Sequence, residues 1–256
     1  MTRHLLLLSA FLTTSLFAFD HTHAAWDKWL KKYVAVNGAA TTVDYKAAKA
    51  APEALKSYTD SVQEVTAQQY KTFQDKEKMA FIINAYNAFT VQLIVDNYPV
   101  KSIKDVGGIF TSPWKKRFFK FLGEEQHLDF LEHSMLRKDW QEPRIHFAVN
   151  CASKGCPALR NEAFTAAKLD TQLEAGAKSF LGDASRNRYD GAKDTLWLSK
   201  IFDWYGEDFV KKAGSVQAFV STRISGDAAK MAKANVEFNA YDWNLNETLP
   251  RGNASN

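Results

Sequence analysis

The stretch from Arg144 to Arg160 holds the residues best suited to chemistry, because it contains a histidine, an asparagine and both cysteines of the chain. Residues 144–150 alternate in polarity, which is typical of a strand with Ile145, Phe147 and Val149 on one face and His146, Ala148 and Asn150 on the other. Cys151 follows at the end of this strand, and residues 152–155 then turn the chain toward Cys156 and Pro157. A loop that leaves a strand in this way is a common place for binding or catalytic groups.

One hypothesis makes Cys151 a catalytic nucleophile. A thiol needs a lowered pKa or an adjacent base to attack a carbonyl at neutral pH, and His146 and His133 are the candidate bases. A further group commonly fixes the tautomer of such a histidine, and the candidates are Glu132, Asn150 and Asp242. The reaction would be acyl transfer: peptide or amide hydrolysis, or transpeptidation. The geometry is an obstacle, because a regular strand points His146 away from Cys151.

The alternative, which we favour at this stage, is a binding or structural module with a disulfide between Cys151 and Cys156. These are the only two cysteines, and export would take them into an oxidising compartment. Four intervening residues allow the Cα separation of roughly 4.4–6.8 Å that a disulfide requires, and Gly155 eases the tight return. His146, Glu132 and Arg144 would then be buried members of a hydrogen-bonded network.

Export is expected from residues 1–18, which combine a short polar start, an apolar run from Leu5 to Phe17 and a small residue, Ala18, before a cleavage point. The apolar run is shorter than the roughly 20 residues needed to span a bilayer. We therefore expect a periplasmic or extracellular protein that does not span the membrane.

The remaining chain is expected to form a single domain over residues 19–250, followed by a frayed tail at residues 251–256. A hydrophobic content of 46% supports a substantial core. The net charge of +4 is spread along the chain, and its densest patch, residues 115–120, resembles an ordinary solvated face. Nucleic-acid binding is not expected. A small molecule, a peptide or a protein remains the expected partner.

The sequence predicts no cofactor, and the histidines do not have the spacing of a structural zinc site. Cleavage after Ala18 would, however, create the amino terminus Phe19-Asp20-His21. Such a terminus is similar to the amino-terminal copper and nickel motif, in which the amine, two amides and the imidazole of His21 supply four nitrogens, and His23 could assist. The alternative is an export remnant without a metal.

Helices dominate the predicted secondary structure. Apolar spacing predicts a helix from Trp26 that ends at Gly38, a second helix from Pro52 and a long third helix from Asp75 to Asn97. The third is apolar nearly all round and belongs at the centre of the domain. Its buried amides Asn84 and Asn87 must be hydrogen-bonded, either to neighbouring loops as structural pins or as part of the site.

Short strands are predicted mainly as hairpins, around Gly123 and around Asp190-Gly191, with a last strand at residues 236–241. Asp129 is placed to begin a short helix over residues 130–137, and residues 169–181 form an amphipathic helix. The predicted fold class is therefore α+β: helices around a small antiparallel sheet, with one buried central helix.

Several of these segments together resemble the domain of unknown function 547 (DUF547). The resemblance rests on residues 80–88, Glu132-His133 with Leu136-Arg137, residues 144–153 with Cys156-Pro157, residues 199–204, and Tyr241-Asp-Trp243 with Leu245-Asn246. It covers nearly all of the chain after residue 18 and implies an exported bacterial protein whose activity is not established. It further implies a core similar to that of papain-like and transglutaminase-like proteins. The polar residues of the matching segments are the candidate binding residues: Asn84, Asn87, Arg144, Asn150, Ser153 and Asp242.

Overall fold

The computed structural model describes residues 18–108 and 111–248, so the expected export signal lies almost entirely, and the expected tail entirely, outside the described residues. The helices are α1 (Ala24–Tyr33), α2 (Tyr45–Ala50), α3 (Glu53–Gln63), α4 (Ala67–Thr72), α5 (Asp75–Asn97), α6 (Arg137–Asp139), α7 (Leu169–Leu181), α8 (Ile201–Trp204), α9 (Gly206–Ala213), α10 (Val216–Ser221) and α11 (Ala228–Met231). Single 3-10 segments are η1 (Ile103–Asp105), η2 (Pro113–Lys115) and η4 (Pro143–Phe147), and η3 (Phe130–Leu136) is a π-helix.

The strands of the described residues form three separate small sheets rather than one. β1 (Val34–Asn37) pairs with β2 (Ala40–Val43), and β3 (Phe119–Phe121) pairs with β4 (Glu124–Gln126). In the third sheet β6 (Thr195–Leu198) lies between an antiparallel β5 (Arg188–Asp190) and a parallel β7 (Asn235–Phe238). The α+β class is confirmed, but a single antiparallel sheet is wrong, because the helices α8 to α11 carry the chain back and make β7 parallel to β6.

The central helix α5 begins and ends where its sequence pattern predicts. Side chains on all faces of α5 are buried, and the helix packs against α2, α3 and η3. It is also long and apolar enough to cross a membrane, but 89% of the relevant window is buried inside the protein. α5 is therefore the core helix of the fold and does not span a membrane.

Two buried amides of α5, Asn84 and Asn87, hold loops from the second half of the chain. Asn84 donates to the Phe164 carbonyl at 2.7 Å and accepts from the Phe164 N–H at 3.0 Å. Asn87 donates to the Ala148 carbonyl at 2.9 Å and accepts from the Asn150 N–H at 2.8 Å. Both are therefore structural pins, and Asn87 fixes the backbone one residue before Cys151.

The predicted strand over residues 144–150 is wrong: its first half is the 3-10 segment η4. Pro143 stands at the first position of η4, where a proline fits a helical turn, and the Glu142 carboxylate accepts from the Arg144 N–H at 3.1 Å. The alternating apolar residues pack into two different hydrophobic cores and do not line one face of a sheet. Ile145 packs into the cluster around α5, whereas Phe147 packs into a second cluster built by α7 to α11.

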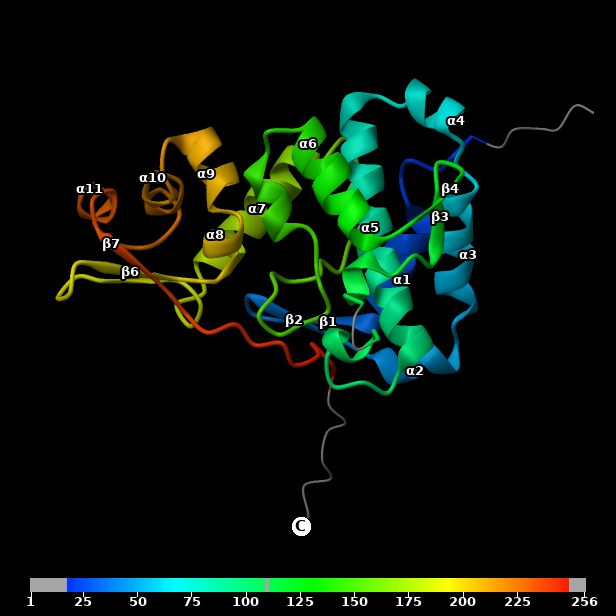
Figure 1. Cartoon of the computed structure of the whole chain (residues 1–256), viewed down its shortest axis with the longest axis horizontal. Helices are drawn as coiled ribbons and strands as arrows, with labels where there is room; N and C mark the ends of the chain where they lie inside the picture. Colours follow the sequence, from blue (N-terminus) through cyan, green and yellow to red (C-terminus); the bar gives the residue numbers. More distant parts are fainter. Residues whose placement is uncertain (1–17, 109–110, 249–256) are drawn as a thin grey trace, which may run out of the picture.

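These two clusters lie side by side in Figure 1, where α1 to α5 occupy one side of the molecule and α9 to α11 with β6 and β7 the other. The segment from η4 to Cys156 runs between them. The C-terminal segment after β7 then returns across this junction. The Gly155 N–H donates to the Asp242 carbonyl and the Lys154 N–H to the Asn244 carbonyl, both at 2.8 Å.

Gly155 was expected to ease a disulfide between Cys151 and Cys156, but the structure gives a different reason for a glycine here. A Cβ at this position would lie 2.9 Å from the ring of Tyr241. The glycine therefore allows Tyr241 to lie directly against the cysteine loop, and it does not serve a disulfide.

The N-terminal segment is held by aromatic side chains. The predicted first helix ends earlier than Gly38, because α1 stops at Tyr33 and Gly38 forms the turn between β1 and β2 at a φ of 63°. His23 is buried, and its Nδ1 is 2.7 Å from the Tyr58 hydroxyl; burial lowers the pKa of His23 to about 3. The ring of His21 packs edge-on against Phe73, with centroids 4.3 Å apart.

Candidate functional site

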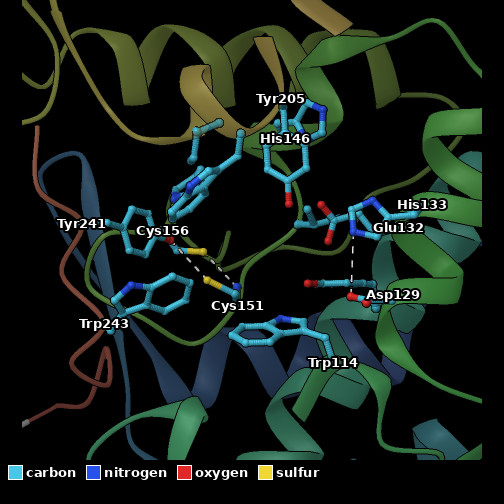
Figure 2. A pocket seen from close by; sticks show the side chains of 15 residues that line it. Trp114, Asp129, Glu132, His133, His146, Cys151, Cys156, Tyr205, Tyr241 and Trp243 are labelled. Atoms are coloured by element: carbon cyan, nitrogen blue, oxygen red, sulfur yellow. Dashed lines mark hydrogen bonds and ion pairs between the residues drawn. The ribbon is translucent and has the colours of Figure 1, made fainter. Parts of the chain in front are cut away.

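A cavity of about 220 Å³ opens at the junction of the two clusters (Figure 2). The elements that line it are far apart in sequence: α5, η2, η3, η4, the cysteine loop, α8 and the C-terminal segment. Its lining residues are Tyr86, Trp114, Asp129, Glu132, His133, His146, Val149, Cys151, Cys156, Pro157, Ile201, Trp204, Tyr205, Tyr241 and Trp243. The cavity thus brings together all four candidate catalytic residues, Cys151, His146, His133 and Glu132.

The cysteines do not form the expected disulfide, and both are free. The Cys156 sulfur instead accepts a hydrogen bond from the Cys151 N–H at 2.9 Å, so the buried side chain of Cys156 is directed toward the backbone of Cys151. Burial raises the pKa of the Cys156 thiol well above its ordinary value. Cys156 is therefore a neutral thiol that supports the loop.

Cys151 is partly exposed to the cavity, and its sulfur lies among hydroxyl groups. Its Sγ is 3.1 Å from the Ser153 hydroxyl and 3.3 Å from the Tyr241 hydroxyl. Hydrogen bonds from Cys156, Ser153 and Tyr241 lower the pKa of Cys151, although burial opposes this. Burial raises the pKa of Tyr241, so that its phenol remains a hydrogen-bond donor. Donors around a sulfur favour the thiolate, which is its reactive form.

The backbone makes a sharp turn directly after this cysteine. Ala152 has a φ of 58°, in the left-handed region that residues other than glycine rarely adopt. The Asn150 side chain holds the turn: its Oδ1 accepts from the Ala152 N–H at 2.9 Å and its Nδ2 donates to the Pro157 carbonyl at 2.7 Å. A strained residue held by buried hydrogen bonds is common at functional sites.

The wall opposite Cys151 in Figure 2 carries Asp129, Glu132 and His133. Glu132 is only 5% exposed, and it lies on the π-helix η3, a type of segment that occurs frequently at functional sites. His133 Nε2 is 3.8 Å from the Asp129 carboxylate, and its Nδ1 is 3.2 Å from the guanidinium of Arg137. Because a guanidinium only donates, Nδ1 accepts this bond and the proton of a neutral His133 is on Nε2.

His146 takes part in a partly buried hydrogen-bonded cluster with Asp208 and Arg137 instead of contacting Cys151. Its Nε2 is 2.7 Å from the Asp208 carboxylate, which also accepts two bonds from Arg137 at 2.6 and 3.0 Å. Burial acts to raise the pKa of Asp208, but the hydrogen bonds from His146 and Arg137 hold it well below its usual range. The ring of Tyr205 stacks on His146 with centroids 4.0 Å apart. Burial and the nearby Glu132 raise the pKa of Tyr205, which stays protonated.

Aromatic side chains form the mouth of the cavity. Trp243 packs near Trp114, Trp204 and Tyr241, with ring centroids 5.7, 5.6 and 4.6 Å away, respectively. Trp204 is 45% exposed although it is large and apolar. Aromatic rings that line an open cavity offer flat, apolar surfaces against which a ligand can stack.

Other predicted binding residues are not part of the cavity. Arg144 is ion-paired with Glu142 at 2.6 Å and lies near Glu174 at 3.4 Å, so it is a structural residue. Asp242 is exposed, and its carboxylate accepts from the Asn244 N–H at 2.9 Å. Asn87 holds the backbone of Asn150 next to Cys151, whereas Asn84 holds the backbone of Phe164, which does not line the cavity. Ser153 contacts Cys151 directly.

The metal prediction remains a prediction. Among residues 18–108 and 111–248, no group of three or more histidine, cysteine or acidic side chains is arranged to hold a metal ion. The amino-terminal motif of His21 requires cleavage after Ala18, which the structure does not test. His23 was expected to assist in binding the metal, but its Nδ1 is bonded to the Tyr58 hydroxyl.

No site role was predicted from the sequence for Asp208, Tyr205, Tyr241 or the three tryptophans of the cavity. Tyr241 and Trp243 belong to one of the segments that resemble DUF547, and Trp204 belongs to another. The resemblance of these segments was the sequence signal that could have identified them. Cys151 and Tyr241 are 90 positions apart, so no local pattern predicts their contact.

Residues 70–181 match the family described as "Protein of unknown function, DUF547". The match supports the resemblance for the part of the chain that contains α5, η3 and the cysteine loop, whereas Tyr205, Asp208, Tyr241 and Trp243 lie outside it. No curated protein matches the chain. No solved structure matches it either, and a papain-like or transglutaminase-like core is not shown.

Proposed function

We propose that this protein is a thiol-dependent acyl-transfer enzyme, with Cys151 as the nucleophile and a peptide or amide as the substrate. The observation that carries the proposal is the environment of the Cys151 sulfur: free, partly exposed to a cavity and surrounded by the hydroxyl groups of Ser153 and Tyr241. A structural cysteine is usually buried in apolar surroundings that raise its pKa. The lowered pKa of Cys151 fits a nucleophile better.

The reaction would take place in two steps. The Cys151 thiolate attacks the carbonyl carbon, and the amine leaves with a proton as a thioester forms on Sγ. Water or a second amine then attacks the thioester and restores the thiol. His133 is the better placed proton carrier, because His146 is bonded to Asp208 and covered by the ring of Tyr205.

The cavity is smaller than the 300–1,000 Å³ typical of sites for drug-sized ligands. It would therefore hold one or two residues of a substrate, with the rest outside. In this proposal the protein acts after export, which follows from the expected signal at residues 1–18 and makes periplasmic or extracellular peptides the available substrates.

A binding module without catalysis is the second candidate. It is favoured by one observation: in the part of the chain that the structure describes, Cys151 Sγ is hydrogen-bonded to the Ser153 and Tyr241 hydroxyl groups and to Cys156, but not to a histidine. In this case the aromatic mouth would bind a small molecule or a peptide, and the thiol would be a contact residue.

Capture of the thioester separates the two candidates. Purified protein is mixed with short peptide thioesters and anilides, quenched in acid and measured by intact mass. An enzyme is expected to gain the mass of the acyl group on Cys151, and hydroxylamine should remove it. The Cys151→Ala variant is the control. A binding module would retain its unmodified mass and release no product with any of the substrates.

A further inference from the structure

We propose that the cavity recognises a cationic group, a primary ammonium or a guanidinium, on the substrate. The inference rests on the proposed function and adds the class of substrate to it. It would make the preferred substrates peptides or amines with a basic side chain, such as lysine, whose charged group enters the cavity beside Glu132.

The charges of the lining are the first reason. Among the described residues, the lining includes the carboxylates Asp129 and Glu132 but no lysine or arginine. The guanidinium of Arg137, which contacts His133, is bound to Asp208 through two hydrogen bonds. Glu132 takes part in no ion pair between described residues, although it is only 5% exposed. A buried carboxylate is costly unless its charge is balanced, so a cationic ligand would relieve this cost.

The aromatic mouth is the second reason. The faces of tryptophan and tyrosine rings attract cations, including the ammonium group of lysine and the guanidinium group of arginine. This chain already contains one such contact at the edge of the site, because the ammonium of Lys104 lies 3.7 Å from the ring centroid of Trp243. Lys104 is not among the residues that line the cavity.

The test measures equilibrium binding to Cys151→Ala, so it does not depend on catalysis. The probes are N-acetyl-lysine amide and N-acetyl-norleucine amide, which have the same carbon chain with and without the ammonium. Binding is followed by tryptophan fluorescence. We expect the lysine probe to bind at least about tenfold more tightly, which corresponds to a charge contact that is partly shielded from water. Glu132→Gln should remove most of this preference, and the exposed Glu237→Gln should leave it unchanged.

Two results would overturn the inference: equal or undetectable binding of the two probes, or a preference that persists in a folded Glu132→Gln variant. If Glu132→Gln does not fold, Asp129→Asn takes its place and is expected to weaken the preference. The proposed function fails separately, if the unmodified protein forms no thioester while Cys151→Ala still distinguishes the probes. In that case the cavity would be a binding site for cationic ligands.

Discussion

Cys151→Ser is expected to lower the rate of acyl transfer by roughly three orders of magnitude or more, with almost no change in melting temperature. Serine has nearly the same shape and can keep the contacts to Ser153 and Tyr241. Its hydroxyl, however, has a pKa far above that of a thiol, and no histidine contacts this position to remove the proton. The measurement is the initial rate with the substrate that forms the thioester, together with a thermal melt of each variant.

Cys156→Ser is the matched control for this substitution. Cys156 is a neutral, buried thiol whose role is to accept the hydrogen bond from the Cys151 N–H, and a serine oxygen can accept the same bond. The rate should therefore remain within about tenfold of the original, since the contact persists. If Cys156→Ser abolished the reaction and Cys151→Ser did not, the roles of the two cysteines would have to be exchanged.

The second large effect is expected from the amides of the central helix. Asn84→Ala and Asn87→Ala should each destabilise the protein by about 1–3 kcal/mol, because each leaves a buried carbonyl and a buried N–H without partners. For a chain of this size this corresponds to a fall in melting temperature of roughly 2–12 °C. Asn87→Ala should also slow the reaction, since Asn87 holds the backbone next to Cys151.

Asn97→Ala provides the control for both variants. Asn97 is an exposed amide at the end of the same helix, so its removal should change stability by no more than about 0.5 kcal/mol. Melting temperatures that are equal for all three variants would contradict the role of Asn84 and Asn87 as buried pins.

The sequence was sufficient to predict the elements whose residues follow one dominant period. α5 and α7 have the bounds that their apolar patterns predict. A helix that is buried on one face has apolar residues at helical spacing, and a helix that is buried on all faces has a continuous apolar run. The hairpins around Gly123 and Asp190 were found from their turn residues. The need to bond the buried amides was also correctly inferred, since a buried polar group without a partner is rare.

Tertiary context overrode the local pattern at the cysteine loop. The alternation of residues 144–150 arises because Ile145 and Phe147 serve two different cores, and not because they share one sheet face. The disulfide was predicted from composition and loop length alone. In the structure the Cys156 sulfur is directed to a backbone N–H, which sequence spacing cannot show.

The cavity could be predicted only in part for a similar reason. Cys151, Glu132, His133 and His146 were all selected because their residue types can do chemistry. Their partners Tyr205, Asp208 and Tyr241 enter through the packing of α8, α9 and the C-terminal segment, which depends on contacts between residues far apart in the chain. No short-range pattern records such contacts.

The most direct test of the central claim is the rate at which iodoacetamide labels each cysteine between pH 5.5 and 9, followed by peptide mapping. Only the thiolate reacts, so the rate follows the thiolate fraction. The lowered pKa of Cys151 predicts that its labelling reaches half of its maximum rate below the ordinary thiol value of about 8.5, while the buried Cys156 remains unlabelled. A midpoint for Cys151 at or above that value, or an absence of free thiols in the purified protein, would contradict the account.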